Sequence, residues 1–256
     1  MTAGGTTTPG EPVAAPARLV LPRYRRDPDS HPPLDSPGYR STSLRHPRQP
    51  LVLLPHLLTE VTGPLLGPGR VGELDHDLTR QHAGEPIGQR IVVFGRVLDG
   101  DGRPVPDSLV EIWQANAGGR YRHTADRWPA ALDPHFDGAG RTVTDSLGRY
   151  EFVTVKPGAY PWRNHDNAWR PAHIHFSLFG RSFTQRLITQ MYFPDDPLFG
   201  QDPIFNSVPE AARRRLVSRF DLGRTRPEWA LAFEFDIVLR GSAATPFEEE
   251  DEDDDH

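Results

Sequence analysis

The sequence predicts an all-β protein, with an antiparallel β-sandwich core, an extended N-terminal arm, long loops and one or two short helices. Two observations carry this prediction. From about residue 91 onward, short apolar runs of strand length alternate with Gly- and Pro-bearing turns. The 256 residues also include 27 prolines and 23 glycines, which favours many turns over long helices. Strands separated in this way are typical of a sandwich.

The first 85 residues lack this strand pattern. Residues 1–17 are rich in Thr, Gly, Pro and Ala, and we expect them to be disordered. Residues 18–85 form a predicted arm, because the many prolines up to residue 70 oppose both regular helix and central strand. We expect the arm to pack on the body of the protein or on a partner. A single β-sandwich domain is expected over residues 86–246.

A series of strands is expected in this domain. The first, residues 91–98, precedes a turn at Asp99-Gly100-Asp101-Gly102 and a second strand at 109–113, and the pattern predicts a hairpin over residues 95–111. The later strands are expected at residues 143–145, 150–155, 174–179, 187–193 and 229–239.

One helix is expected, over residues 208–220. Ser207 and Glu210 have the S-x-x-E spacing of a capping box, and Pro209 falls in the first turn. We interpret the arginine run at 213–215 as a solvated helix face rather than a binding patch. The acidic tail, residues 247–256, is expected to be disordered.

Composition argues against several classes of function. The formal net charge is −6, but residues 248–255 contribute eight negative charges, so the rest of the chain carries +2 and no basic stripe for nucleic acid. No apolar run approaches the roughly 20 residues of a membrane helix, and residues 1–17 lack a signal-peptide layout. The absence of cysteine removes disulfides and thiolate metal sites. We therefore expect a cytoplasmic protein that binds neither nucleic acid nor membrane.

The stretch from Tyr160 to Phe176 is the richest in reactive side chains. His173 and His175 open a predicted strand, where residues i and i+2 share a face, so both imidazoles can reach one ion. Two histidines alone suit zinc, copper, nickel or iron, and an ordinary pair of core or surface histidines fits the pattern as well. A tyrosine joins such a site only if the ion is acidic enough to remove its proton, as Fe(III) is.

Two tyrosines are candidates for that role. Tyr160 follows a Pro-Gly turn, and Tyr121 lies in a polar loop after a strand. Spacing alone favours the simpler interpretation of each, a half-buried tyrosine whose hydroxyl is hydrogen-bonded. The Asp75-His76-Asp77 stretch could mimic a metal motif, but we interpret it as a capped turn with paired side chains.

Three segments, residues 113–123, 157–164 and 169–176, closely resemble the ligand-bearing segments of the intradiol ring-cleavage dioxygenases. The similarity runs from Tyr39 to Gly241 and includes Thr62-Gly63-Pro64, residues 75–78 and residues 235–241. Within the family, the chain is most similar to the β subunits of protocatechuate 3,4-dioxygenases. Met191, the Phe199-Gly200-Gln201 loop and the acidic tail depart from the family pattern.

The resemblance implies a non-haem Fe(III) site within a catalytic domain at 86–246. Its implied metal ligands are Tyr121, Tyr160, His173 and His175. Tyr160 would also leave the metal and accept a substrate proton. Arg170 would stabilise developing negative charge on the substrate ring, with Gln190 beside it. Tyr39 and Trp162 would wall the substrate pocket. Without the resemblance, Gln190 is an ordinary strand amide and Trp162 a core tryptophan.

The implied reaction is cleavage of protocatechuate by O2 to 3-carboxy-cis,cis-muconate, with no nicotinamide, flavin or haem. Catechol and hydroxyquinol enzymes of the superfamily carry a helical N-terminal segment, whereas this chain has a proline-rich arm, as the protocatechuate β subunits do. The implied partner is a homologous α subunit without iron, in a higher-order α–β assembly. Catechol or hydroxyquinol is the alternative substrate within the family.

Two other classes compete with this interpretation. A non-enzymatic β-sandwich binding module is one, because the pattern at 95–111 also occurs in carbohydrate- or partner-binding sandwiches. A cupin-type metalloenzyme is the other, because cupins also use H-x-H on a strand. Cupins need a glutamate about four residues after the second histidine, where this chain has Phe179-Gly180, so we rank this class low.

Overall fold

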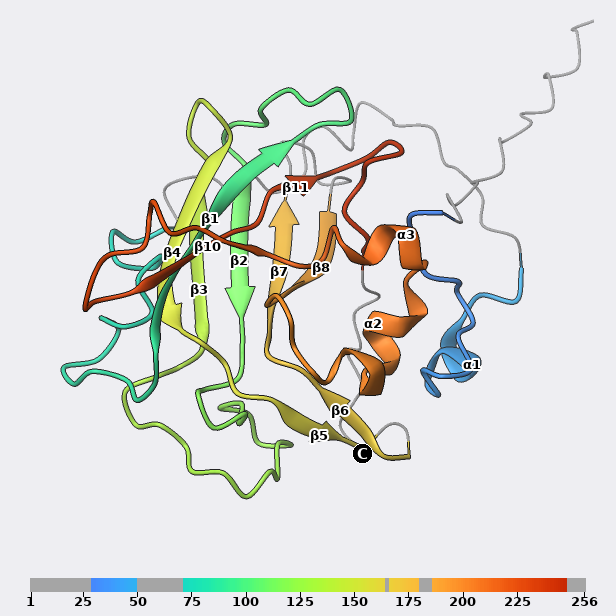
Figure 1. Cartoon of the computed structure of the whole chain (residues 1–256), viewed down its shortest axis with the longest axis horizontal. Coiled ribbons are helices and arrows are strands. Elements are labelled where there is room, and N and C mark those ends of the chain that lie inside the picture. The colour runs from blue at the N-terminus through green and yellow to red at the C-terminus, as the bar shows by residue number, and fades with distance from the viewer. Residues whose placement is uncertain (1–28, 50–70, 164–165, 180–185, 248–256) are drawn as a thin grey trace, which may run out of the picture.

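The computed structural model describes residues 29–49, 71–163, 166–179 and 186–247. In these residues two sheets pack face to face, and a two-stranded hairpin lies at one end (Figure 1). The first sheet contains β1 (Arg90–Leu98), β4 (Arg149–Val155), β9 (Arg219–Phe220), β10 (Leu231–Glu234) and β11 (Ile237–Val238). The second contains β2 (Leu109–Trp113), β3 (Ala139–Val143), β7 (His173–Phe179) and β8 (Arg186–Tyr192). The hairpin is β5 (Tyr160–Trp162) with β6 (Ala168–Arg170).

Most strand pairs are antiparallel, so the expected all-β sandwich is confirmed. The exceptions are β10 and β11, which both run parallel to β1. Alternate residues of each sheet meet in one apolar core, in which side chains such as Val93 and Val97 of β1 join Ile112 of β2 and Ile174 and Phe176 of β7.

The same alternation places the other residues of β7 and β8 on the face that points away from this core. His173 lies opposite Tyr192 and His175 lies opposite Gln190 in the β7–β8 register, so the four side chains share that outer face. Trp113 of β2 lies on the other side of His175. The second sheet therefore presents two adjacent histidines from a rigid strand.

The predicted helix at 208–220 is wrong. The structure has α2 (Pro203–Ser207) and α3 (Glu210–Arg213), and Val208 and Pro209 between them are extended. Residues 216–218 then run beside β8, where Leu216 accepts from and Ser218 donates to the backbone of Tyr192, so this stretch cannot continue a helix. The Ser207 hydroxyl donates to the Ile204 carbonyl instead of capping the next helix. With α1 (Thr42–Arg45) and the 3₁₀ turn at Phe199–Gln201, the described residues hold more helices than expected, all short.

The arginine run is also more structural than predicted. Arg213 donates to the Val208 and Asn206 carbonyls, and Arg215 donates to Ser30 and Ala244, while Arg214 is exposed. The interpretation as a solvated helix face is therefore wrong for the two outer arginines. The guanidinium of Arg215 ties the N-terminal arm to the C-terminal strand region.

Three strand predictions also need correction. The pattern at 95–111 does not form a two-strand hairpin, because β1 and β2 belong to different sheets and the turn gives only a Leu98–Pro104 bridge. The strand expected at 143–145 ends at 143. The strand expected at 229–239 is interrupted because the carboxylate of Asp236 accepts the Arg96 backbone N–H at 2.8 Å in place of a backbone carbonyl.

The structure describes residues 29–49 and 71–85 of the predicted arm, and residues 29–49 lie beside α2 and α3 (Figure 1). The His31 ring packs on Phe247 at 4.3 Å between centroids, and Tyr39 meets Trp162 edge to face at 5.1 Å. Residues 1–17 and all of the predicted disordered tail at 247–256 except Phe247 lie outside the described residues, whereas Phe247 itself is ordered against His31.

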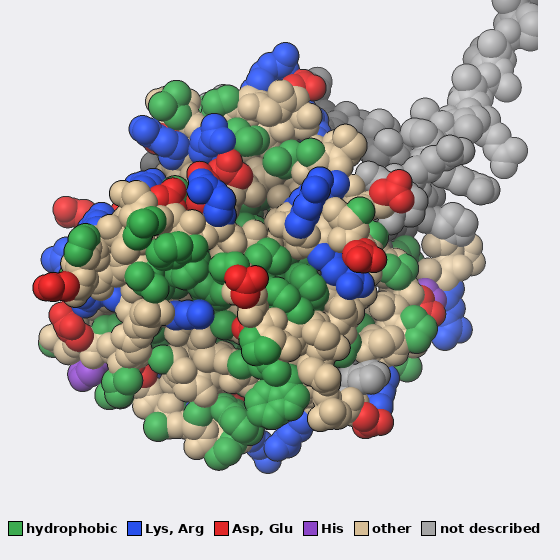
Figure 2. Space-filling view, in the orientation of Figure 1, with side chains coloured by type: hydrophobic (Ala, Val, Ile, Leu, Met, Phe, Trp, Pro, Cys, Tyr) green, Lys and Arg blue, Asp and Glu red, His purple; other side chains and the backbone are tan. Residues whose placement is uncertain are grey.

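The described part of the chain holds no helix long and apolar enough to cross a membrane. Figure 2 shows acidic and basic side chains interspersed on the face in view, without a broad single-sign patch.

Candidate metal centre

The structure brings together all four residues expected to bind a metal, from three separate segments. His173 and His175 come from β7, Tyr160 begins β5, and Tyr121 lies in the loop after β2. The β5–β6 hairpin pairs Tyr160 with Arg170 and so folds this tyrosine back toward the start of β7. We call these four residues the ligand quartet.

The polar atoms of the ligand quartet converge on one point. The Tyr121 hydroxyl lies 3.4 Å from His173 Nε2 and 3.1 Å from His175 Nε2. The Tyr160 hydroxyl lies 3.4 Å from His173 Nε2, and the two histidine Nε2 atoms lie 3.2 Å apart. Atoms that bind one metal ion at about 2 Å each lie about 3 Å from one another. These separations therefore fit a shared ion.

The protonation of His173 also suits a metal ligand. Its Nδ1 donates to the Pro171 carbonyl at 2.7 Å, so the proton of the neutral ring is on Nδ1 and the lone pair of Nε2 faces the quartet. The side chain is only 2 % exposed, and this burial, with the nearby charge of Arg170, lowers the pKa of His173 well below its usual 6.5. A neutral imidazole with an inward lone pair is the form that binds metal.

His175 is held by an aromatic neighbour. Its ring stacks on Trp113 with centroids 4.7 Å apart and an angle of 7° between the planes. This contact arises because Trp113 and His175 are cross-strand partners on the outer face of the second sheet. The sheet and the tryptophan together fix where Nε2 of His175 points.

The loop that carries Tyr121 is built around Asp126. The Asp126 carboxylate accepts the backbone N–H of Tyr121 and that of Trp128, each at 2.7 Å. Gly119, with φ of +79°, lets this loop approach the segment before Tyr160, because a Cβ there would lie 2.4 Å from the Ala159 carbonyl oxygen. The two tyrosine-bearing segments are thus packed against each other.

The chemistry of the donor set limits which ion fits. The described residues contain no group of three or more His, Cys, Asp or Glu side chains placed to hold a metal. The histidine pair therefore needs the two tyrosines to complete a site. Phenol oxygens bind a metal well after losing their protons, which favours a hard, highly charged ion over a soft one.

A second cluster lies beside the ligand quartet and consists of Arg170, Gln190, Tyr192 and Asp202. We call it the arginine cluster. Arg170 Nε lies 3.2 Å from an Asp202 carboxylate oxygen, and its terminal nitrogen donates to Gln190 Oε1 and to the Tyr192 hydroxyl. The Tyr192 hydroxyl also lies 2.7 Å from Gln190 Oε1 and 3.0 Å from Asp202. All four side chains are buried.

The sequence pointed to Arg170 and Gln190 but missed Tyr192 and Asp202. Asp202 precedes Pro203 at the start of α2 and caps it by accepting the Ile204 N–H at 2.9 Å. An aspartate before a proline is a signal for a helix start. Its pairing with Arg170 is a long-range contact for which the sequence offers no local signal.

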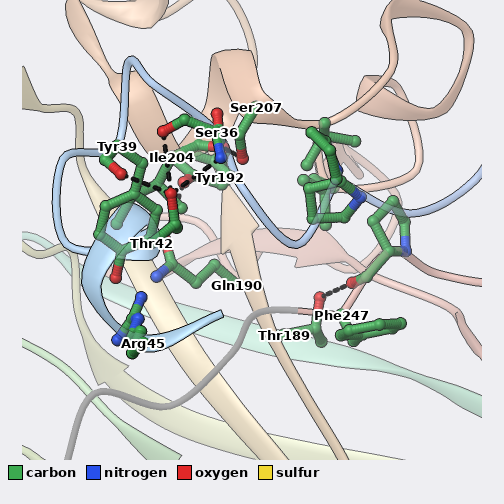
Figure 3. Close-up of a pocket in the computed structure, with 15 residues that line it drawn as sticks. Ser36, Tyr39, Thr42, Arg45, Thr189, Gln190, Tyr192, Ile204, Ser207 and Phe247 are labelled. Atoms are coloured by element: carbon green, nitrogen blue, oxygen red, sulfur yellow. Dashed lines mark hydrogen bonds between the residues drawn. The ribbon is translucent and has the colours of Figure 1, made fainter. Parts of the chain in front are cut away.

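The arginine cluster also fixes which way the Gln190 amide faces. Its oxygen accepts from Arg170 and lies within hydrogen-bond distance of Tyr192. Its nitrogen is buried and has no hydrogen-bond partner among the described residues. Gln190 therefore has a spare donor, and its side chain extends toward Tyr39 and Arg45 of the arm (Figure 3).

The residues expected to wall a substrate pocket also lie together. Trp162 meets Tyr39 edge to face, and the Arg170 guanidinium lies over the Trp162 ring at 5.9 Å from its centroid. Tyr39 and Gln190 line a mainly apolar cavity between the arm, β8 and α2 (Figure 3). Arg45 lines the same cavity and lies 4.9 Å from the centroid of the Tyr39 ring.

The Asp75-His76-Asp77 stretch is a turn, as interpreted. Asp75 pairs with Arg141 at 2.7 Å, and the hydrogen bond from Arg141 lowers the pKa of this carboxyl. The Asp77 carboxylate accepts from the backbone and hydroxyl of Thr79. Neither aspartate is directed to a common metal site with His76.

Two family models match the chain. The model described as "Dioxygenase" matches residues 61–241, and the model described as "Protocatechuate 3,4-dioxygenase beta subunit N terminal" matches residues 24–56. The first covers the sandwich and all four members of the ligand quartet. The second covers most of the described arm, including Tyr39.

Two curated relatives agree with these matches. The chain is 59% identical to a protocatechuate 3,4-dioxygenase beta chain of Burkholderia cepacia, over 87% of this chain and 96% of that protein. It is 31% identical to a protocatechuate 3,4-dioxygenase alpha chain of Pseudomonas putida, over 77% of this chain and 98% of that protein.

The fold is similar to that of 3-chlorocatechol 1,2-dioxygenase from Rhodococcus opacus 1CP. The TM-score is 0.50 at 24% identity, over 69% of this chain and 70% of that chain.

Proposed function

Since the chain belongs to the intradiol ring-cleavage dioxygenase family, we propose that it is the iron-bearing β subunit of a protocatechuate 3,4-dioxygenase. The proposed reaction cleaves protocatechuate with O2 to 3-carboxy-cis,cis-muconate, so both oxygen atoms enter the product. The observation that carries the proposal is the ligand quartet, in which two histidine nitrogens and two tyrosine oxygens converge with separations of 3.1 to 3.4 Å.

The proposed cofactor is non-haem Fe(III), held by Tyr121, Tyr160, His173 and His175. Two tyrosinates offset two of its three positive charges, and the four residues of the quartet supply only hard and borderline donors. When bound, the ion would act as a Lewis acid for the two oxygens of a catechol.

Tyr160 has the proposed role of base. Its hydroxyl contacts His173, and its backbone belongs to the short hairpin β5–β6 rather than to the second sheet. A tyrosinate can accept a proton from a catechol hydroxyl, which a neutral histidine ligand does less easily because its lone pair is already engaged. The three other members of the ligand quartet would stay in place.

Arg170 has the proposed role of stabilising negative charge on the substrate ring. Its guanidinium stays protonated, so it contributes a fixed positive charge and no proton. It is 3 % exposed, and in such a dry site the charge acts more strongly than it would in water. Gln190 would place its amide nitrogen beside the ring, and Trp162 and Tyr39 would form the pocket wall.

The proposed substrate and partner follow the names of the relatives. The most informative relatives are beta and alpha chains of protocatechuate 3,4-dioxygenase, and both are similar to this chain over most of its length. We propose an assembly of this chain with a homologous α chain in a higher-order α–β complex. The boundaries at 18–85 and 86–246 and the cytoplasmic location belong to the same proposal.

Oxygen consumption tests the proposed function. The purified chain, loaded with iron and co-expressed with its α partner, should consume O2 with protocatechuate much faster than with catechol or hydroxyquinol. The chain without its partner is measured in parallel. Turnover of catechol in preference to protocatechuate would favour the other substrate class, and no turnover of any catechol by the iron-loaded complex would overturn the proposal.

A further inference from the structure

We propose that Asp202 is a positioning residue for the proposed reaction, because it fixes the guanidinium of Arg170 in the orientation that faces the substrate ring. The inference rests on the proposed function and deepens it. Asp202 lies 32 residues after Arg170 in the sequence, on a different element, and makes no contact with the ligand quartet in the interactions described above.

The burial of the pair sets the strength of this constraint. The side chain of Asp202 is 0 % exposed and that of Arg170 is 3 % exposed, so neither can turn to water without disrupting the packing. A buried charge without its partner is costly, whereas the pair together is tolerated. The ion pair, with 3.2 Å between Arg170 Nε and an Asp202 carboxylate oxygen, therefore favours a guanidinium held against Asp202 while both groups are charged.

The planar geometry of the guanidinium explains how contacts with its neighbours define its orientation. The group is planar, with its N–H donors in a fixed fork. Asp202 attracts the Nε side of the group as an ion pair at 3.2 Å rather than through a hydrogen bond, while Gln190 Oε1 and the Tyr192 hydroxyl accept hydrogen bonds from a terminal nitrogen. The ion pair and the two hydrogen bonds act at different atoms of one rigid plane, so together they position it.

Tyr192 links the aspartate to Gln190. Its hydroxyl lies 3.0 Å from Asp202 and 2.7 Å from Gln190 Oε1, and its backbone is held between Leu216 and Ser218. Through this hydroxyl and through Arg170, Asp202 also keeps the Gln190 oxygen turned inward and its nitrogen free to donate. One carboxylate thus orients both residues that are proposed to face the substrate.

Asparagine at residue 202 separates this role from helix capping. Asparagine caps a helix about as well as aspartate, so its side-chain oxygen can still accept the Ile204 N–H. It is nearly the same size but carries no charge, so Asp202→Asn removes the ion pair with Arg170 and keeps the start of α2. Asp202→Ala would remove both and is less informative.

The test uses the iron-loaded complex with its α partner and protocatechuate as substrate. Asp202→Asn should lower kcat at least about tenfold, with a smaller change in KM and with unchanged iron content and visible spectrum. Arg170→Gln should lower kcat further. The double variant Asp202→Asn/Arg170→Gln should be no slower than Arg170→Gln alone, because the aspartate acts through the arginine. Asp101→Asn, which breaks the exposed pair with Arg103, is the matched control and should leave kcat unchanged.

Two results would overturn the inference. One is an Asp202→Asn enzyme with wild-type kcat. The other is a double variant whose loss equals the product of the two single losses, because a purely structural aspartate would act independently of Arg170. Failure of the proposed function is a different outcome, since the wild-type complex itself would then not turn over protocatechuate.

Discussion

The ligand quartet and the arginine cluster are neighbours on one face of the second sheet, yet they differ in how their charges are balanced. In the arginine cluster, the negative charge of Asp202 offsets the positive charge of Arg170, and the Gln190 amide nitrogen is left as a spare donor. In the ligand quartet, histidine nitrogens and tyrosine oxygens face one another at 3.1 to 3.4 Å. Few of these atoms carry a proton that could form a hydrogen bond with the others. The arginine cluster contains its own counter-charge, whereas the ligand quartet is proposed to bind a cation.

This difference suits the two clusters to two functions, metal binding and action on the substrate. The ligand quartet is proposed to bind the ion, so changes there should alter iron content and colour. The arginine cluster is proposed to act on the substrate, so changes there should alter turnover while the iron stays bound. Substitutions in each cluster can therefore show whether iron binding and turnover are separable.

The largest effect is expected from His173→Ala. Loss of this ligand should remove most of the bound iron and lower kcat at least about a thousandfold, equivalent to about 4 kcal/mol of barrier. Iron analysis and oxygen uptake measure the two losses. His76→Ala is the control, because His76 lies in the turn at residues 75–77 and should keep both iron and activity. If His76→Ala lost its iron instead, the metal would bind at the turn of residues 75–77 and not in the ligand quartet.

Tyr160→Phe should have the next largest effect. The phenylalanine keeps the ring but cannot bind the ion or accept a proton, so kcat should fall about a hundredfold or more. The remaining three ligands should still hold iron, with a visible band that differs from that of the wild type. The assignment of Tyr160 is wrong if both the band and the turnover are unchanged.

Arg170→Lys should lower turnover without removing the iron. Lysine keeps the positive charge but loses the planar fork that contacts Asp202, Gln190 and Tyr192. We expect kcat to fall about tenfold to a hundredfold while iron content and visible spectrum stay those of the wild type. A variant that loses its iron would show that the two clusters are not separable.

Tyr150→Phe should have the smallest effect, and it contrasts a core tyrosine with the tyrosines of the ligand quartet. Tyr150 is buried between the sheets and donates to the Phe235 carbonyl, and burial raises its pKa well above the usual 10.0. It should stay protonated, so the variant should keep iron, colour and activity. Loss of the hydrogen bond should lower the free energy of unfolding by about 1 to 2 kcal/mol.

The pH dependence of stability gives the same residue a second test. Above pH 10 the unfolded chain releases the Tyr150 proton and the folded protein keeps it, so wild-type stability should fall as pH rises through that range. Denaturant unfolding between about pH 9 and about pH 11 should show a steeper fall for the wild type than for Tyr150→Phe. Equal slopes would mean that Tyr150 ionises in the folded protein.

Much of the fold could be predicted from short-range patterns. The strands β1, β2, β4, β7 and β8 lie within a residue or so of their predicted positions, because apolar runs bounded by turns are a local signal. The prediction of a helix at 208–220 was wrong because hydrogen bonds between residues 216–218 and β8 outweigh the local capping signal. The split of the last strand at Asp236 depends on a side chain that bonds to another strand.

The candidate site divides in the same way. Residue spacing alone left His173, His175 and the tyrosines open to several interpretations, and only the family resemblance joined Tyr121 to them. The structure then brought the quartet together. Asp202 and Tyr192 were missed because their proposed importance comes from contacts with Arg170, which lies on another element of the fold. No local sequence pattern predicts such long-range contacts.

The visible spectrum of the iron-loaded complex tests the central claim most directly. Tyrosinate bound to Fe(III) gives a charge-transfer band that colours a protein burgundy red. The wild-type complex with stoichiometric iron should show this band, and the double variant Tyr121→Phe/Tyr160→Phe should lack it at any iron content. An iron-replete wild-type complex that is colourless would contradict the proposed ligand set and, with it, the proposed function.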